Sequence, residues 1–228
     1  MGMAPLAQSH PDSADRAPRR MPRTVALVGI DGSGKTTQAR VVAAELLAAG
    51  FPAAYRQNAG GRHWFGRIAH FLGRSDAEDL FGRRGTLLLE SLLRWLAIAR
   101  TLLRRAVNRE IAVMDRYAVC QYASLRAHGA RPSAERFARL AYRMFPRPDV
   151  TFLLSVDPAV AQDRIERRGY DTETMDYLRT AAGAYRALPE YPEFVVIDAN
   201  DTPEQVTKAI LTVLDGSASL RGDWPCNR

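Results

Sequence analysis

The feature that most constrains the fold of this chain is a glycine-rich segment that joins an apolar run to a helical stretch. Residues Thr24–Val28 have the length and character of a buried strand, and Thr36–Ala49 have the pattern of a helix. Between them, positions 29–36 read Gly-Ile-Asp-Gly-Ser-Gly-Lys-Thr, which is the spacing of a phosphate-binding loop. A glycine turn without a ligand explains the segment poorly, because it follows the first strand directly and contains Lys35, one of only two lysines.

The residue types in this loop suit the polyphosphate of a nucleotide. Glycines allow backbone N–H groups to point inward around an anion, and the N-terminus of the following helix adds positive potential. Lys35 is placed to reach the β- and γ-phosphate oxygens, and the Thr36 hydroxyl is a ligand for Mg²⁺. The residues predicted to hold the nucleotide phosphates are Gly29, Gly32, Ser33, Gly34, Lys35, Thr36 and Thr37.

A second motif narrows the class of phosphate-binding protein. The apolar run Ile111–Met114 has strand length and is followed by Asp115 and Arg116. A carboxylate at the carboxyl end of a parallel strand is placed to hold Mg²⁺, directly or through water. A hydrolytic motor usually has a glutamate after this aspartate, and the sequence has no Asn-Lys-x-Asp segment for reading guanine. Arg116 is better suited to holding a second phosphate group.

Strand-like and helix-like segments alternate along the rest of the chain. Apolar runs bounded by turn residues recur at Pro52–Tyr55, Val150–Val156 and Phe194–Ile197. Alternation of this kind implies parallel strands joined by right-handed crossovers, so the sequence predicts a three-layer α/β fold. Helices are predicted at Thr36–Ala49, Gly61–Leu72, Thr86–Asn108, Val160–Arg167, Met175–Leu188 and Pro203–Leu214, with a broken helix across Gln121–Met144.

The two ends of the chain have the composition of loose tails. Residues 1–23 mix proline, serine, aspartate and arginine without the apolar core of a signal peptide, and residues 215–228 mix glycine, serine, proline and charge. We therefore expect a disordered tail over 1–23, one domain over 24–214 and a loose tail over 215–228.

Several motifs, in the same order along the chain, resemble those of thymidylate kinases, a family of P-loop nucleoside monophosphate kinases. The resemblance extends from about Thr24 to Leu214. It implies a P-loop kinase fold with a five-stranded parallel sheet and a short helical lid at about 164–176. It also implies ATP as donor with Mg²⁺, a nucleoside monophosphate as acceptor, and commonly a homodimer. The motifs are the glycine-rich loop, Asp115-Arg116-Tyr117, and the segments 148–158, 164–169 and 196–200.

The resemblance implies roles for residues on the acceptor side. Asp31 matches a loop carboxylate that approaches the acceptor's sugar hydroxyl, and Arg116 matches the arginine that grips the acceptor phosphate. Arg94 matches a helix arginine at the base or the phosphate of the nucleotide. Asp31, Arg94 and Arg116 are therefore expected to bind the acceptor, and Asp31 and Arg116 are expected to take part in catalysis with Lys35.

The resemblance also implies a lid that supplies positive charge. Gly32 stands where some members of the family have an arginine in the loop, so the lid is expected to neutralise the transferring phosphoryl group. Arg164 and Arg168 share one helix face and are the predicted catalytic arginines, whereas Arg167 points elsewhere. Asn200 belongs to the segment that resembles the loop on the adenine side of the family's site.

The acceptor pocket departs from the family pattern. Glu90 stands where members usually have an aromatic residue that stacks on thymine, and Cys120 and Ser124 replace a hydroxyl and a ring. These changes favour an acceptor other than dTMP, with Glu90 and Gln121 hydrogen-bonding a polar base edge. A shift of the helix register would instead leave Glu90 facing solvent.

The segment after the second strand departs as well. It contains Arg62, which is expected to contact a phosphate, and Trp64, which is expected to restore stacking on the base from the opposite wall.

Three functions remain open from the sequence. Phosphorylation of dTMP by ATP is favoured by the resemblance, and a kinase for another nucleotide or a specialised metabolite phosphate is the alternative. A P-loop protein that binds a partner without turnover is disfavoured, because a binding module does not need Lys35, Thr36, Asp115, Arg116 and the lid arginines together.

Charge and cysteine content bear on the partners. The formal net charge is +7, and six arginines between Arg126 and Arg147 face one acidic residue, Glu135. A solvated face explains this run better than nucleic acid, which we regard as an unlikely partner.

Two distant cysteines form no disulfide framework and indicate the cytoplasm. The charges within Leu87–Leu103 argue against a membrane span.

Overall fold

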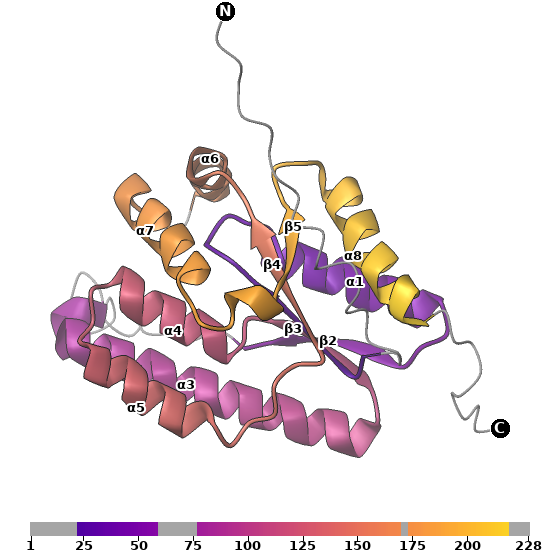
Figure 1. Ribbon diagram of the computed structural model, residues 1–228, viewed down its shortest axis with the longest axis horizontal. Helices are drawn as coiled ribbons and strands as arrows, with labels where there is room; N and C mark the ends of the chain where they lie inside the picture. Colours follow the sequence, from indigo (N-terminus) through magenta and orange to yellow (C-terminus); the bar gives the residue numbers. More distant parts are fainter. Residues whose placement is uncertain (1–21, 59–76, 170–172, 219–228) are drawn as a thin grey trace, which may run out of the picture.

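The computed structural model describes residues 22–58, 77–169 and 173–218, and its centre is one parallel β-sheet (Figure 1). The strands lie in the order β2-β3-β1-β4-β5, and every neighbouring pair is parallel. This confirms the predicted α/β fold with a five-stranded parallel sheet. The strands are β1 (Thr24–Val28), β2 (Ala53–Gln57), β3 (Ile111–Asp115), β4 (Val150–Ser155) and β5 (Val195–Asp198).

Helices cover both faces of the sheet and produce the three layers (Figure 1). On one face α1 packs on β1, β2 and β3 and against α8, while on the other α3 packs on β3 and α4 packs against α3, α5 and α7. Among the described helices, none is both long and apolar enough to cross a membrane. The helices are α1 (Lys35–Ala48), α3 (Ala77–Asn108), α4 (Ala118–Ala127), α5 (Pro132–Tyr142), α6 (Pro158–Arg168), α7 (Met175–Arg186) and α8 (Pro203–Ala218), with a 3₁₀ turn η2 (Tyr191–Glu193).

The central strands form because their side chains are apolar except at Thr24, which begins β1, and at Asp115, which ends β3. Every residue of β1 and of β3 is buried, which is the pattern of strands covered on both faces by helices. The register places Leu27 of β1, Asp115 of β3 and Gln57 of β2 at the same level. The carboxyl ends of these three strands therefore meet at one edge of the sheet.

The helix boundaries differ most from the sequence prediction in α3, in the predicted broken helix and in α8. Helix α3 begins at Ala77 rather than Thr86, and Gly82, with φ of 66°, interrupts its regular geometry. The predicted broken helix is two helices, because Pro132 stands in the first turn of α5 and cannot continue α4. Helix α8 continues to Ala218, past the expected start of the loose tail. The helix predicted at Gly61–Leu72 lies outside the described residues, as do residues 1–21 and 219–228.

Candidate functional site

The two sequence motifs come together at the carboxyl edge of the sheet. The glycine-rich loop leaves β1, and Arg116 follows β3, which is the neighbour of β1. The backbone N–H of Arg116 donates to the carbonyl of Leu27 over 3.1 Å. The tertiary structure thus joins segments that lie almost ninety positions apart, as the parallel-sheet prediction requires.

Two glycines allow the loop to pass between β4 and α6. A Cβ at Gly29 would lie 2.6 Å from the carbonyl oxygen of Leu154 in β4, and one at Gly32 would lie 2.4 Å from that of Ala161 in α6. Both glycines also have positive φ, 144° and 79°. A side chain at either position is therefore excluded by backbone atoms and by backbone conformation together. Gly34, with φ of 88°, then caps α1.

Lys35 is buried inside the loop that it belongs to. Its ammonium donates to the carbonyl of Ile30 over 2.5 Å and lies 3.7 Å from the Asp31 carboxylate. Burial lowers the pKa of Lys35, and the nearby Arg116 charge lowers it further against the opposite effect of Asp31 and Asp115. A buried cation with few compensating anions strongly attracts an added anion, such as a phosphate.

Thr36 and Asp115 form a polar pair suited to a divalent cation. The Thr36 hydroxyl donates to Oδ2 of Asp115 over 2.6 Å, and Tyr55 of β2 approaches the same oxygen at 3.4 Å. The other oxygen, Oδ1, is buried without a hydrogen-bond partner. An orphaned carboxylate oxygen beside a threonine hydroxyl fits a Mg²⁺ ion. In the described part of the chain no three His, Cys, Asp or Glu residues cluster as a metal site, so such an ion would rely on substrate phosphates for further ligands.

Arg116 points into the loop and pairs with Asp31. Its Nη2 contacts Oδ1 of Asp31, and that carboxylate raises the pKa of the Arg116 guanidinium well above its usual value. The backbone of Arg116 has φ of 76°, in the left-handed region that a residue with a side chain rarely adopts. Strained conformations of this kind often occur at functional sites. Asp31, Lys35 and Arg116 are thus mutual neighbours, as their predicted shared role requires.

Glu90, Arg94 and Gln121 are all buried between α3 and α4. The Nη1 of Arg94 donates to Oε1 of Gln121 over 2.7 Å, and the three residues are 2%, 5% and 0% exposed. The alternative that Glu90 faces solvent is therefore wrong. The Nε of Arg94 and the Nε2 of Gln121 are buried without hydrogen-bond partners. Because arginine only donates, its bond to Gln121 requires the amide oxygen to face Arg94 and leaves the amide N–H groups as donors.

The predicted lid arginines occupy different environments on α6. Arg164 is partly buried and donates to the carbonyl of Ala199 over 2.9 Å, next to Asn200. Arg167 pairs with Asp163, one turn earlier, and Arg168 is exposed. Asn200 accepts a hydrogen bond from the backbone N–H of Asp157, which ties the loop after β5 to the start of α6. The middle of the predicted lid, residues 170–172, lies outside the described residues.

The remaining predicted site residues are Ser33, Thr37, Arg62 and Trp64. Ser33 is buried in the loop, where its hydroxyl lies 3.4 Å from the Lys35 ammonium, and Thr37 is exposed on α1. Arg62 and Trp64 lie outside the described residues.

The sequence analysis missed two tyrosines near the site. Tyr55 of β2 lies beside Asp115. Nothing in the sequence of β2 marks Tyr55 as a residue of the site. Tyr185 of α7 is buried; burial raises its pKa well above the usual value, as does Cys120 beside it, while Arg116 and Arg94 act in the opposite direction. The tertiary contact between α4 and α7 brings Tyr185 there, and no local motif marks it.

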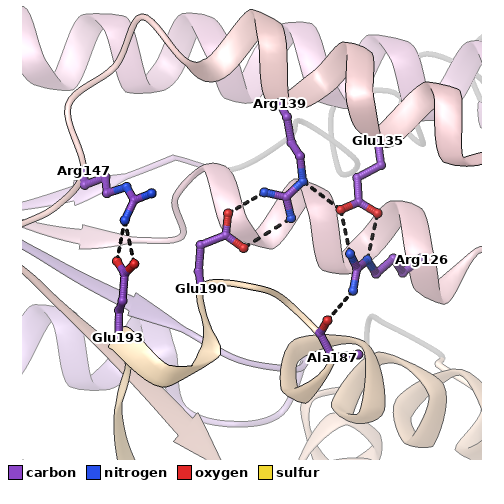
Figure 2. Close-up of polar contacts among 7 residues, drawn as sticks. All are labelled: Arg126, Glu135, Arg139, Arg147, Ala187, Glu190 and Glu193. Atoms are coloured by element: carbon purple, nitrogen blue, oxygen red, sulfur yellow. Dashed lines mark hydrogen bonds and ion pairs between the residues drawn. The ribbon is translucent and has the colours of Figure 1, made fainter.

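Three of the six arginines in the arginine-rich segment form ion pairs, with Glu135 of the same segment and with Glu190 and Glu193 from farther along the chain. Figure 2 shows Arg126 and Arg139 both bonded to Glu135, Arg139 also bonded to Glu190, and Arg147 bonded to Glu193. The predicted solvated face describes only part of the segment, because Glu190 and Glu193 of the η2 region pair with Arg139 and Arg147. Arg131, Arg136 and Arg143 are exposed.

The chain is similar to thymidylate kinases over most of its length. A family model for thymidylate kinase matches residues 27–210. A probable thymidylate kinase of Archaeoglobus fulgidus is 29% identical over 201 residues, which cover 86% of this chain and 97% of that protein. One of Methanococcoides burtonii is 30% identical over 202 residues, covering 84% and 96%. The thymidylate kinase of Neisseria gonorrhoeae is 28% identical over 204 residues, covering 86% and 97%.

Proposed function

This chain belongs to the thymidylate kinase family, and on that premise we propose that it transfers the γ-phosphoryl group of ATP to dTMP, forming dTDP and ADP. The observation that carries the proposal is the convergence of Lys35, from the phosphate-binding loop, and Arg116, from β3, on the Asp31 carboxylate. One cation belongs to a loop built for a polyphosphate, and the other lies within reach of a second anion. The geometry suits two phosphate groups brought end to end.

On the donor side, the loop binds the ATP phosphates. Its inward N–H groups and the N-terminus of α1 bind the β-phosphate, and Lys35 leaves the Ile30 carbonyl to contact the β- and γ-oxygens. Thr36 and Asp115 would hold Mg²⁺, which supplies charge neutralisation across the β- and γ-phosphates. Asn200 lies beside the adenine in this proposal.

On the acceptor side, Arg116 binds the monophosphate and Asp31 accepts from the sugar hydroxyl. The second pKa of a monophosphate is about 6, so the attacking oxygen is ionised at neutral pH without a strong general base. Arg116 therefore orients the nucleophile rather than deprotonating it. Alignment and charge neutralisation supply most of the catalysis in phosphoryl transfer.

Helix α6 is placed to complete the site. Its backbone touches the loop at Gly32, and Arg164 and Arg168 share the face that we propose turns toward the transferring phosphoryl group. In the described structure Arg164 bonds to Ala199, so this role requires a closing movement of α6. Closure would also exclude the water that otherwise hydrolyses ATP.

The test is a direct assay of diphosphate formation with ATP, Mg²⁺ and single nucleoside monophosphates. We expect turnover of dTMP, and a loss of about 10²–10³-fold in kcat for Lys35→Met, since that variant lacks the cation at the transferring group. Lys208→Met, which changes the chain's other lysine on α8, is the matched control and should retain wild-type turnover. Absence of turnover with every nucleotide would disprove the kinase assignment.

One observation favours a second acceptor class. Glu90 is 2% exposed and lies one helical turn before Arg94, in the cluster that contains Gln121. A carboxylate only accepts hydrogen bonds and has about four acceptor positions, so it suits an amino group such as N4 of cytosine better than the O4 of thymine. We propose that dCMP is a second acceptor. Glu90→Gln should then lower kcat/KM for dCMP more than for dTMP, whereas equal losses would contradict this role.

We also propose that the protein is a cytoplasmic homodimer. Large apolar side chains are exposed along α3 and α5, and a groove of about 1110 Å³ runs between these helices and the loop after α4. A second copy presenting the same stripe would cover both stripes at once in a two-fold arrangement. The cytoplasmic location rests on Cys120, which is buried and unpaired. The exposed apolar residues are Leu88, Leu92, Leu96, Leu103, Val107, Phe137, Leu140 and Met144.

A further inference from the structure

We propose that Asn58 is a positioning residue for phosphoryl transfer, which holds the backbone of Asp115 and Arg116 in the conformation that places their side chains in the site. This inference rests on the proposed function, in which Arg116 binds the acceptor phosphate and Asp115 supports the metal. Asn58 comes directly after β2 and has no role in the mechanism derived above.

Arg116 needs an external restraint to keep its conformation. Its φ of 76° is in the left-handed region, which costs a residue with a side chain about 1–2 kcal/mol. Its N–H is held by the Leu27 carbonyl, and its guanidinium by Asp31. The Asp31 contact is the one that an acceptor phosphate would compete for, so the backbone must be held by something other than the side chain. Its carbonyl group is the remaining point of attachment.

Asn58 supplies that attachment on both sides of the Arg116 Cα. Its backbone N–H donates to the Asp115 carbonyl over 3.0 Å, and its side-chain Nδ2 donates to the Arg116 carbonyl over 2.9 Å. Asn58 is 0% exposed, so water does not compete for either bond. One buried residue thus restrains two consecutive carbonyls, which flank the point where the chain turns from β3 into the site.

Thr101 of α3 fixes the orientation of the Asn58 amide. Thr101 is 1% exposed, and its hydroxyl donates to Oδ1 of Asn58 over 2.8 Å. With its oxygen bonded to Thr101, the amide must present its N–H₂ group to the Arg116 carbonyl. Arg94 stands two turns before Thr101 on the same helix face. The chain of bonds from Thr101 through Asn58 to Arg116 therefore links α3, which carries Arg94, to the strand end that carries Arg116.

A purely structural role and a positioning role predict different kinetics. Loss of a buried hydrogen bond lowers stability wherever it occurs, by about 1–3 kcal/mol. Loss of the restraint on Arg116 additionally misplaces the acceptor phosphate, and a displacement of about 1 Å can lower a rate by about 10²-fold. The acceptor-side constants should change, while the KM for ATP should not, because the ATP phosphates are bound by the loop after β1 and by Lys35 at the start of α1. Loss of the Thr101 hydroxyl also leaves the backbone bond from Asn58 to Asp115 in place.

The experiment compares Thr101→Val with Thr24→Val as its matched control. Thr24 is also a buried threonine whose hydroxyl bonds a distant side chain, Asp149 over 2.8 Å, but it lies at the opposite end of β1. Steady-state kinetics with dTMP and ATP and thermal unfolding are measured for both. We expect Thr101→Val to lower kcat about 10-fold or more and to raise the KM for dTMP, with an unchanged KM for ATP. Thr101→Ser, which keeps the hydroxyl, should restore activity, and Thr24→Val should lose only thermal stability.

Asn58→Asp gives a second, pH-dependent readout. An ionised carboxylate would face the Arg116 carbonyl with an oxygen and repel it, whereas a protonated one can donate to it. The activity of Asn58→Asp relative to the wild type at the same pH should therefore rise as pH falls. A ratio that is constant with pH, or Thr101→Val kinetics no different from those of Thr24→Val, would overturn the proposal.

A crystal structure of Thr101→Val separates this proposal from the proposed function. Arg116 is expected to leave the left-handed region, and an Arg116 φ that stays near 76° with its side chain on Asp31 would overturn the positioning role whatever the activity. Wild-type protein that turns over no nucleotide would instead refute the kinase function, and the φ of Arg116 in the variant would still decide the role of Asn58.

Discussion

At the scale of single residues, the loop is defined as much by missing side chains as by present ones. Gly32 has no room for a Cβ beside Ala161, so an arginine from the loop is excluded in this conformation. Positive charge beyond that of Lys35 must therefore come from outside the loop, which is consistent with the proposed role of α6.

Gly32→Ala should destabilise the protein more than Gly34→Ala does. Both positions have positive φ, but a Cβ at Gly34 meets no atom within 4 Å, so that variant carries only the cost of conformation, about 1–3 kcal/mol. Gly32→Ala adds the collision with the α6 backbone. Chemical unfolding of both variants measures the difference in the free energy of unfolding. Equal values would contradict this prediction, because they would show that α6 can move away from the Cβ without a measurable cost.

Lys35→Met should lose activity without losing stability. Because burial lowers the pKa of Lys35 below its unfolded value, the folded state disfavours the charged ammonium at neutral pH. That penalty is relieved as pH rises through the folded pKa toward the unfolded value of 10.5. The variant should thus have a melting temperature equal to or above that of the wild type at pH 7, with a smaller gain as pH rises above the folded pKa. A clear loss of stability at pH 7 would contradict this.

At the scale of elements, ion pairs join α4 and α5 to the end of α7 and the η2 turn. Arg126 bonds both Glu135 and the Ala187 carbonyl, and Arg139 bonds Glu135 and Glu190 (Figure 2). The Arg139 guanidinium also lies 4.3 Å from the centre of the Tyr122 ring. Burial raises the pKa of Tyr122 to about 12, so it stays neutral beneath the guanidinium. Arg126 and Arg139 thus hold elements of the fold together.

Glu135→Gln should lower stability in a pH-dependent way. Hydrogen bonds from Arg126, and then from Arg139, lower the pKa of Glu135 below 4.5, so the stabilisation is present above about pH 4.5 and is lost as pH falls through the folded pKa. We expect a loss of about 1 kcal/mol at pH 7, or roughly 2–4 °C in melting temperature, that shrinks under acid conditions. Glu193→Gln is the control, because Arg147, its partner, is 75% exposed and the loss should be smaller. A loss for Glu135→Gln that is the same at all pH values would refute the charge explanation.

At the scale of the whole molecule, α3 and α5 expose an apolar stripe beside a groove of about 1110 Å³. Phe137→Arg should convert the proposed dimer to a monomer, because a charged side chain would be buried in the contact. Light scattering after size-exclusion chromatography measures the mass. Leu47→Arg places the same residue on an exposed apolar position of α1 and should leave the mass unchanged. A wild-type protein with the mass of one chain would refute the dimer.

The sequence by itself determined the phosphate-binding loop, the α/β class and the strand ends that carry Asp115 and Arg116. These features are local: closely spaced glycines specify a backbone path, and an apolar run followed by a polar residue specifies where a buried strand ends. The structure changed strand limits by only one or two residues, and it confirmed the five-stranded parallel sheet.

Only the tertiary structure decided which distant groups meet. The bond from Thr101 to Asn58 spans 43 positions, the pair of Arg139 and Glu190 spans 51, and Gly32 lies against α6. Glu90 was placed inside the protein by the packing of α3, not by any pattern in its own neighbourhood. Contacts of this kind depend on the angle and rotation with which whole helices pack, and neither quantity is encoded in residues adjacent to the contact. The loop that binds phosphate could therefore be found in the sequence, whereas the residue that holds Arg116 in place could not.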